Sequence, residues 1–217
     1  MHLYELVADV TSGEINNYNF VSRGILLQNS GRLTEAASAY RSAIQFRPKL
    51  ALAHLNLGIT LSQMGHNDHA IKILDQCSKL DDNGLKDPKT NANARVSAMW
   101  HLGKLLIEAG EVKRAISVLL SGVKLGGSES MHNMLGGAYQ ALGQVDTAEM
   151  WYSSALQTNP HHVPAQLMMA KLLAKNVSFS KCKYSGFKLN RASHSCVELE
   201  LNTKVSLKIC KFRLIFH

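Results

Sequence analysis

Two pairs of histidines come nearest, by type and spacing, to a metal site in this chain. His66 and His69 are three residues apart, which places both on one face of a helix, and His161 is followed directly by His162. A zinc site needs three or four ligands, and no cysteine or carboxylate completes either pair. We therefore predict no bound metal and expect these histidines to be ordinary helix and turn residues.

Residues typical of phosphate binding or acid–base catalysis lack the context that their chemistry requires. The glycine pairs 126–127 and 136–137 follow no strand, so neither is expected to form a phosphate-binding loop. The adjacent carboxylates Asp81 and Asp82 lie at the end of a helical segment, where we expect solvated turn residues. The sequence therefore predicts no catalytic residue and no cofactor.

The last 42 positions hold one modification motif and three of the four cysteines. Asn176 begins the tripeptide Asn-Val-Ser, a signal for N-linked glycosylation that is used only in the secretory pathway. Cys182, Cys196 and Cys210 are 14 residues apart, unlike the close pairs of a zinc site. Cys77 is the single cysteine of the preceding region, so we expect no disulfide framework there.

An internal repeat predicts the elements that would position any site. Four segments align without a gap, and their opening glycines are Gly24, Gly58, Gly103 and Gly136. A second glycine follows seven residues later in each segment, at Gly31, Gly65, Gly110 and Gly143. The spacing of the first two segments is 34 residues, the period of the tetratricopeptide repeat (TPR), in which each unit is a pair of antiparallel helices.

The small and large residues that recur at the same positions of each segment predict how the two helices pack. The opening glycine is expected where the helices approach closely, and the second glycine is expected at positive φ at the end of the first helix. A large residue fills the space beside the small ones, at Tyr40, Leu74, Leu119 or Tyr152. We also expect Asp68 and Asp146 to cap the second helices of their units, Asp146 in a capping box with Glu149.

The sequence thus predicts an all-α TPR superhelical solenoid of about four and a half units. Between units two and three lies the insertion LKDPKTNANAR (85–95), which is either a functional loop or a tolerated surface insertion. Residues 1–16 are expected to be the remnant of a preceding helix. The predicted units are 17–50, 51–84, 96–128, 129–162 and the half unit 163–175.

The positive charge is concentrated in the C-terminal tail, residues 176–217. The chain has a net charge of +8, and this tail holds eight lysines and arginines against two glutamates. Positions 197–209 alternate apolar and polar residues, as a strand does. Three interpretations stay open: a tail foreign to the fold, a disordered basic arm that binds nucleic acid or acidic lipid, or a genuine domain. The interruption of the fifth unit favours the first.

The remaining candidate site is a surface, because the first helix of each unit lines the concave side of such a solenoid. An alternative is that several of its apolar residues pack against a neighbouring unit. The longest run of apolar or glycine residues, 134–139, is far too short to span a membrane. The candidates for the groove are Tyr18, Val21, Ile25, Leu52, Leu55, Asn56, Ile59, Trp100, Lys104, Glu108, Asn133, Gln140, Leu167 and Lys171.

Beyond the general repeat pattern, the region from about 17 to 175 resembles one family, the transmembrane and TPR repeat-containing proteins. The insertion is the most specific element, because ordinary TPR units lack it. The stretches that carry the resemblance are LALAHLNLGITLSQMG (50–65), GLKDPKT (84–90), LGKLLIEAG (102–110), NMLGGAY (133–139), AEMWYSSAL (148–156) and HHVPAQLMMAKLLA (161–174).

The resemblance implies a location and a class of partner. Family members are endoplasmic-reticulum proteins whose membrane half transfers mannose from dolichyl-phosphate mannose to Ser/Thr of cadherin-type domains. Their TPR half is expected to face the lumen and bind protein, either the cadherin-type acceptor or a lumenal chaperone. We expect no nucleic-acid partner, and contact with the membrane only through the half that this chain lacks.

The membrane half is absent from this sequence, so the resemblance carries over no catalytic residue. Catalysis needs one site that holds donor and acceptor together, and we expect no activity from this chain alone. The alternative function is a free-standing soluble TPR adaptor or scaffold, which would be cytoplasmic if the chain is complete as given.

Overall fold

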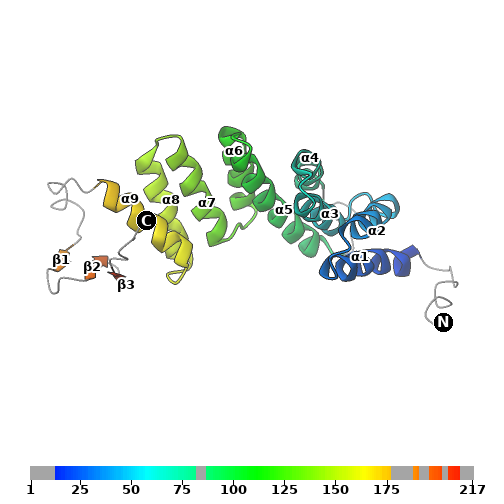
Figure 1. Ribbon diagram of the computed structural model, residues 1–217, viewed down its shortest axis with the longest axis horizontal. Helices are drawn as coiled ribbons and strands as arrows, with labels where there is room; N and C mark the ends of the chain where they lie inside the picture. Colours follow the sequence, from blue (N-terminus) through cyan, green and yellow to red (C-terminus); the bar gives the residue numbers. More distant parts are fainter. Residues whose placement is uncertain (1–12, 82–86, 177–187, 191–195, 202–204, 211–217) are drawn as a thin grey trace, which may run out of the picture. The chain divides into compact units, whose positions relative to one another are not determined.

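The computed structural model describes residues 13–81, 87–176, 188–190, 196–201 and 205–210 of the 217-residue chain. Side chains are described for residues 20–81 and 87–173. The chain divides into two compact units, Met1–Gly127 and Ser128–His217. Within each unit, helices that are neighbours in the sequence also pack against each other, as Figure 1 shows.

The first unit contains six helices within its described residues, arranged as three consecutive pairs. Helices α1 and α2, α3 and α4, and α5 and α6 pack within the pairs, and α2 packs on α3 and α4 on α5 between them. Helix α3 also packs on α5, so the first helices of the second and third pairs lie side by side. Their bounds are α1 Gly13–Asn29, α2 Leu33–Phe46, α3 Ala51–Gln63, α4 Asn67–Ser78, α5 Pro88–Glu108 and α6 Val112–Lys124.

The second unit contains a fourth pair of helices, a ninth helix and a small sheet. Helix α7 (Glu129–Ala141) packs on α8 (Val145–Thr158), and α8 packs on α9 (Val163–Asn176). The strands β1 (Lys188–Asn190), β2 (Cys196–Leu201) and β3 (Val205–Cys210) pair antiparallel in the order β1-β2-β3. The segment 197–209, which alternates apolar and polar residues, therefore coincides with two paired strands.

The turn between the two helices of each pair is built on a glycine, as the sequence predicts. Gly31, Gly65, Gly110 and Gly143 have φ values between 75° and 81°. This left-handed region costs a residue with a Cβ atom free energy, whereas glycine adopts it without strain. The repeat of this glycine thus fixes where each first helix ends and where the chain reverses.

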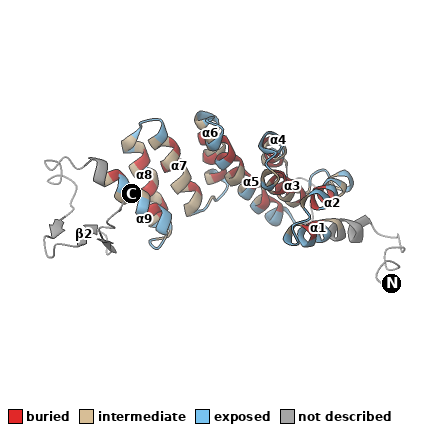
Figure 2. Cartoon of the chain, viewed as in Figure 1, coloured by how far each residue is buried: buried red, intermediate tan, exposed pale blue. Residues whose placement is uncertain are grey.

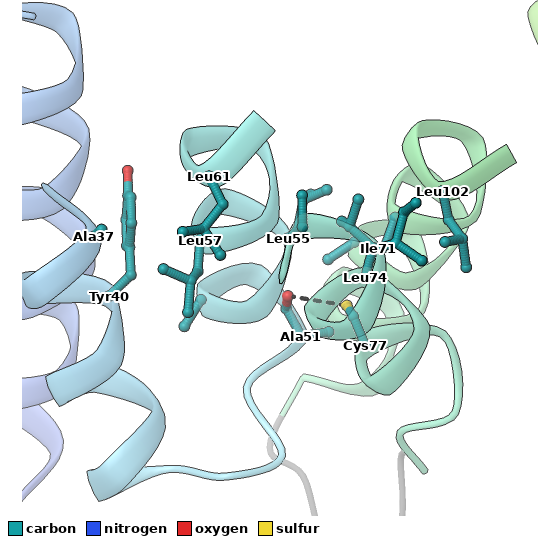
Figure 3. Packing of buried hydrophobic residues seen from close by; sticks show 14 of the residues in the cluster. Ala37, Tyr40, Ala51, Leu55, Leu57, Leu61, Ile71, Leu74, Cys77 and Leu102 are labelled. Carbon is teal, nitrogen blue, oxygen red and sulfur yellow. Dashed lines mark hydrogen bonds between the residues drawn. The ribbon is translucent and has the colours of Figure 1, made fainter. Parts of the chain in front are cut away.

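The buried core lies between the helices, where each large residue meets the opening glycine of its own pair (Figure 2). A Cβ added to Gly58 would lie 2.5 Å from Cγ of Leu74, so only glycine lets the two helices approach this closely. Figure 3 shows Tyr40, Leu57, Leu74 and other core residues of the first unit stacked from one helix to the next. Burial of each such side chain contributes about 1.5–3 kcal/mol.

The predicted helix caps at two aspartates are wrong. Helix α4 begins one residue before Asp68, with His66 at its N-cap, and α8 begins one residue before Asp146, with Gln144 at its N-cap. Neither N-cap residue makes a side-chain capping hydrogen bond. Each helix begins two residues after its turn glycine, so both aspartates lie in the first turn, where the helix dipole still favours negative charge.

The insertion is largely helical rather than a loop. Its residues 88–95 form the first two turns of α5, and Asn91 and Ala94 are buried. The Oδ1 atom of Asp87 accepts a hydrogen bond from the Thr90 N–H at 3.0 Å. Hydrogen bonding from the Thr90 side chain, and then from this N–H, lowers the pKa of the Asp87 carboxyl group. A proline in the first turn, such as Pro88, is compatible with a helix because it lacks an N–H that would have no partner there.

No helix among the described residues is long and apolar enough to cross a bilayer. Residues 1–12, which include most of the predicted N-terminal remnant, lie outside the described residues; positions 13–16 belong to α1.

Candidate protein-binding surface

The candidate groove residues lie on the first helices of the pairs: α1, α3 and α5 in the first unit, and α7 and α9 in the second. Two of them, Val21 and Leu55, are only 5% and 8% exposed and belong to the core of the first unit. They occupy the same position, three residues before the opening glycine, where the helix faces its neighbours. These two side chains support the solenoid and are not available to a ligand.

The residue that follows the opening glycine is at least partly exposed in all three pairs of the first unit. Ile25 is 39% exposed, Ile59 is partly exposed while also packing against the core, and Lys104 is exposed. Leu52 and Asn56 on the same face of α3 are partly exposed. The first unit therefore offers a row of side chains across α1, α3 and α5, mostly apolar at α1 and α3 and charged at α5.

Helix α5 supplies the charged end of this row. The Nζ atom of Lys104 lies 3.8 Å from Oε1 of Glu108, and both side chains are more than half exposed. An exposed pair of this kind contributes little to stability, so both groups remain free to exchange partners. Burial, with the nearby charge of Lys104, lowers the pKa of His101 and so favours the neutral form of its ring.

In the second unit the exposed candidates are Leu167 and Lys171 on α9, and Asn133 on α7 is partly exposed. Leu167 and Lys171 stand at the two register positions that Val21 and Ile25 hold in α1. The side chain of Tyr18, on α1, and that of Asn176, the last residue of α9, lie outside the described side chains.

Gln140 has an internal role that the sequence analysis missed. Its Oε1 atom accepts a hydrogen bond from the Tyr152 hydroxyl at 2.8 Å, and Gln28 accepts from the Tyr40 hydroxyl at 2.9 Å. The signal is visible in the sequence: both units with tyrosine at the large position have glutamine at this place, whereas the leucine units have Ser62 and Ile107. The glutamine satisfies a hydroxyl group that would otherwise be buried unpaired.

Two candidate residues carry buried polar atoms that have no hydrogen-bond partner among the described residues, Nε1 of Trp100 and Oδ1 of Asn133. The indole of Trp100 packs edge-on against the His101 ring, with centroids 4.8 Å apart. Unpaired buried polar groups are uncommon in folded proteins. A ligand that accepts from the Trp100 indole, or one that donates to the Asn133 amide oxygen, would satisfy them.

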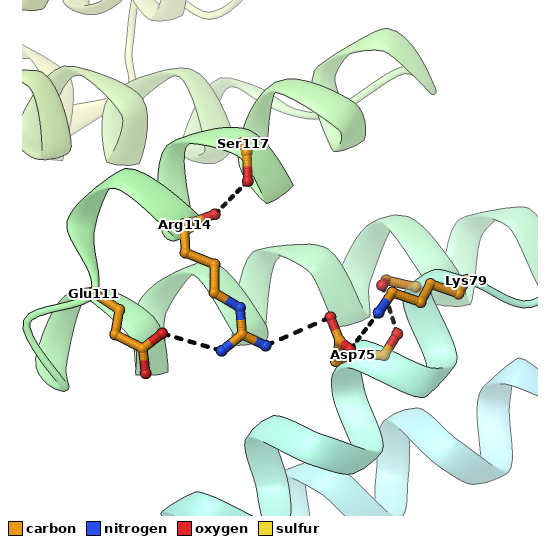
Figure 4. A network of polar contacts seen from close by, with 6 residues as sticks. Asp75, Lys79, Glu111, Arg114 and Ser117 are labelled. Carbon is orange, nitrogen blue, oxygen red and sulfur yellow. Dashed lines mark hydrogen bonds and ion pairs between the residues drawn. The ribbon is translucent and has the colours of Figure 1, made fainter.

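The second helices carry a separate network of charges, shown in Figure 4. Arg114 on α6 lies 3.8 Å from Asp75 on α4 and 3.1 Å from Glu111, and Lys79 binds Asp75 at 2.6 Å. This network ties α4 to α6. It lies on the second helices, and none of the groove candidates takes part in it.

The described residues hold no cluster of three or more His, Cys, Asp or Glu side chains that could bind a metal. The rings of His66 and His69 do lie near each other, with centroids 6.4 Å apart, and both side chains are exposed. Burial raises the pKa of Cys77 to about 12, and its thiol donates to the carbonyl oxygen of Ala51 at 3.3 Å. Cys77 is thus a packing residue and a poor nucleophile.

Comparison with family models agrees with the helical pairs. A model described as TPR repeat matches residues 28–65, and one described as tetratricopeptide repeat matches 51–83 and 129–162. This chain contains tetratricopeptide repeats.

The TPR chain is similar to part of several much longer curated proteins. It is 38% identical over 189 residues to protein O-mannosyl-transferase TMTC2 from Mus musculus and equally to that from Homo sapiens. Each match covers 70% of this chain and 23% of the relative. The protein of the same name from Drosophila melanogaster is 36% identical over 194 residues. These matches confirm the predicted resemblance, and the chain spans less than a quarter of the length of these relatives.

Solved TPR structures share the fold. MamA has a TM-score of 0.61 at 20% identity, covering 74% of this chain and 82% of that chain. PilF of Pseudomonas aeruginosa has a TM-score of 0.61 at 16% identity, with 76% and 71% covered. YrrB, described as a TPR protein with an unusual peptide-binding site, has a TM-score of 0.56 at 17% identity, with 72% and 76% covered.

Proposed function

We propose that this chain is the protein-interaction module of a protein O-mannosyl-transferase of the TMTC2 kind. The observation that carries the proposal is the 38% identity over 189 residues to two such enzymes, within a chain made of TPR pairs. The module supplies no chemistry of its own. Its role is to bind a protein segment and hold it near the membrane half, where mannose is transferred to a hydroxyl group.

The binding surface is the row of outward side chains on the first helices of the first unit. Ile25 and Ile59 give it apolar contact, and Lys104 and Glu108 give it polar groups at one end. Such a row suits an extended segment that places apolar side chains across α1 and α3. In the proposed enzyme the segment comes from the acceptor, a cadherin-type domain, or from a lumenal chaperone.

The test measures binding of the 217-residue chain to fluorescent peptides that tile a cadherin-type domain, by fluorescence polarisation. Ile25→Asp and Ile59→Asp are expected to lower the affinity for the bound peptide about tenfold or more, because each variant buries a charge against an apolar contact. Leu26→Asp is the matched control: it changes an aliphatic residue on the same helix that is 70% exposed and lies outside the row. Circular dichroism establishes that all variants remain helical.

Equal loss of binding in Leu26→Asp would show that the row is not the binding surface. Binding of lumenal chaperone peptides but of no cadherin-type peptide would assign the module to a chaperone partner and remove the acceptor role.

We propose that the native location of this module is the lumen of the endoplasmic reticulum. An antibody raised against residues 17–175 provides the test, on sealed microsomes treated with protease. Protection of the epitope, lost on adding detergent, is the expected result. A protease-sensitive or soluble epitope in the cytosolic fraction would instead support the free-standing TPR adaptor.

A further inference from the structure

Helix α3 begins without a cap of its own. Its first residue is Ala51, and the preceding residue, Leu50, has no polar side chain that could accept from the first N–H groups. The N–H groups of the first turn have no acceptor within a helix, so they need partners from elsewhere. Ala51 is fully buried, which withholds water as that partner.

The partner comes from the insertion. The Ala51 N–H donates to Oδ1 of Asn91 at 2.8 Å, across 40 residues of sequence. Asn91 lies in the first turns of α5 and is itself only 5% exposed. The carbonyl oxygen of Ala51 accepts from the thiol of Cys77 on α4, as Figure 3 shows. Both backbone groups of Ala51 are therefore bound by side chains from the following two helices.

The three pairs differ in how exposed one apolar side chain at their ends is, and the difference agrees with contact between the insertion and the second pair. Phe46, Leu80 and Leu125 stand at the same position, six residues after the large core residue of their unit. Phe46 and Leu125 are 58% and 48% exposed, whereas Leu80 is partly buried and packs against the core. The sheltered position belongs to the second pair, the one that the inserted turns of α5 follow.

We propose that Asn91 is a positioning residue that fixes the first turn of α3 against α5. Helix α3 carries Leu52, Asn56 and Ile59, the mostly apolar part of the row. Helix α5 carries Lys104 and Glu108, its charged part. The bond between Asn91 and Ala51 prevents α3 from sliding along α5, so it sets the axial offset between the apolar and charged parts of the row. The meaning of this offset for binding rests on the proposed function; the bond itself is tested without any ligand.

The chemistry of the site explains the choice of asparagine. An amide oxygen accepts the hydrogen bond while remaining neutral in a buried place, where a lone charge would be costly. Alanine at position 91 would leave a buried N–H group unpaired. Aspartate would keep an acceptor oxygen, and its charge would face the positive end of the α3 dipole.

The experiment measures amide hydrogen exchange of the 217-residue chain by NMR. In Asn91→Ala the Ala51 amide is expected to exchange about tenfold faster or more, since it loses a buried hydrogen bond. Asn91→Asp is expected to retain most of the protection. Asn93→Ala is the matched control, because Asn93 is on the same helix, two residues away, and is exposed.

A second measurement separates positioning from a general loss of stability. Nuclear Overhauser contacts between side chains of α3 and α5 are expected to keep the native pattern in Asn91→Asp and to change to pairs shifted along the helices in Asn91→Ala. Exchange rates in α6 serve as the reference for global opening. The proposal is overturned if the Ala51 amide is equally protected in Asn91→Ala, or if exchange in α6 accelerates as much as at Ala51. Failure of peptide binding with an intact Asn91 effect would refute the proposed function alone.

Discussion

The ring of Tyr152 on α8 leaves no room for a side chain at Gly136 on α7. A Cβ on Gly136 would lie 2.5 Å from Cε1 of Tyr152, and Tyr152 is fully buried and cannot move aside. Gly137, the next residue, has no such neighbour: the nearest atom to an added Cβ is the Tyr152 hydroxyl oxygen, 3.8 Å away. Packing against Tyr152 thus excludes a side chain at Gly136 but not at Gly137.

This contrast predicts opposite effects of one substitution at neighbouring positions. Gly136→Ala is expected to lower the free energy of unfolding by about 1–2 kcal/mol, because the overpacking exceeds the gain in helix propensity. Gly137→Ala is expected to leave it unchanged or raise it by up to about 1 kcal/mol. Urea denaturation followed by circular dichroism measures both. A stabilised Gly136→Ala would contradict the close packing of α7 on α8.

The buried tyrosines predict a loss of stability in alkali. Burial raises the pKa of Tyr40 and of Tyr152 to about 12, from a usual value of 10.0. Between these values the unfolded chain releases protons that the folded chain retains, so the free energy of unfolding falls as pH rises from about 10 to 12. This stability is fully present below pH 10.

Thermal melts between pH 8 and 11.5 check the effect. The double variant Tyr40→Phe, Tyr152→Phe is expected to be less stable at neutral pH, because it loses both hydrogen bonds to glutamine, but less sensitive to alkali. If the melting temperature falls equally with rising pH in the native and variant chains, the effect belongs to other groups, among them the Cys77 thiol.

Cys77 is expected to resist thiol reagents in the folded chain. The thiol is fully buried, its pKa is raised to about 12, and it donates to the Ala51 carbonyl oxygen. Only the thiolate reacts, so labelling requires opening of the α3–α4 pair. Iodoacetamide labelling, resolved by peptide mass spectrometry to separate Cys77 from the three tail cysteines, is expected to be slow without urea and fast with it. Rapid labelling in native buffer would show that this pair opens easily.

Asn176 is expected to carry an N-linked glycan if the module faces the lumen. The sequon Asn176-Val177-Ser178 begins at the last residue of α9. A mobility shift that peptide-N-glycosidase removes, and that Ser178→Ala abolishes, is the expected result for the chain made behind a secretory signal sequence. A second sequon introduced elsewhere in the chain reports whether the chain enters the lumen. If that sequon is glycosylated and Asn176 is not, this assignment is refuted.

The sequence by itself determined the repeat architecture, because each unit contains the residues that shape its own pair of helices. The turn glycines, the small–large pairs such as Gly58 and Leu74, and the period near 34 all act over short distances within a pair. Local steric rules of this kind are visible in the order of residue types. The same patterns predicted which helices line the candidate surface.

Tertiary structure alone decided which of the surface candidates are exposed and what the insertion does. Val21 and Leu55 resemble Ile25 and Ile59 in residue type, but packing between neighbouring helices buries the first two and leaves Ile25 exposed and Ile59 partly exposed. The sequence left the insertion as a functional loop or a surface insertion, yet Asp87 and Pro88 begin a helix whose Asn91 reaches Ala51, 40 residues earlier. Contacts between residues so far apart depend on the three-dimensional path of the chain, which no local pattern encodes.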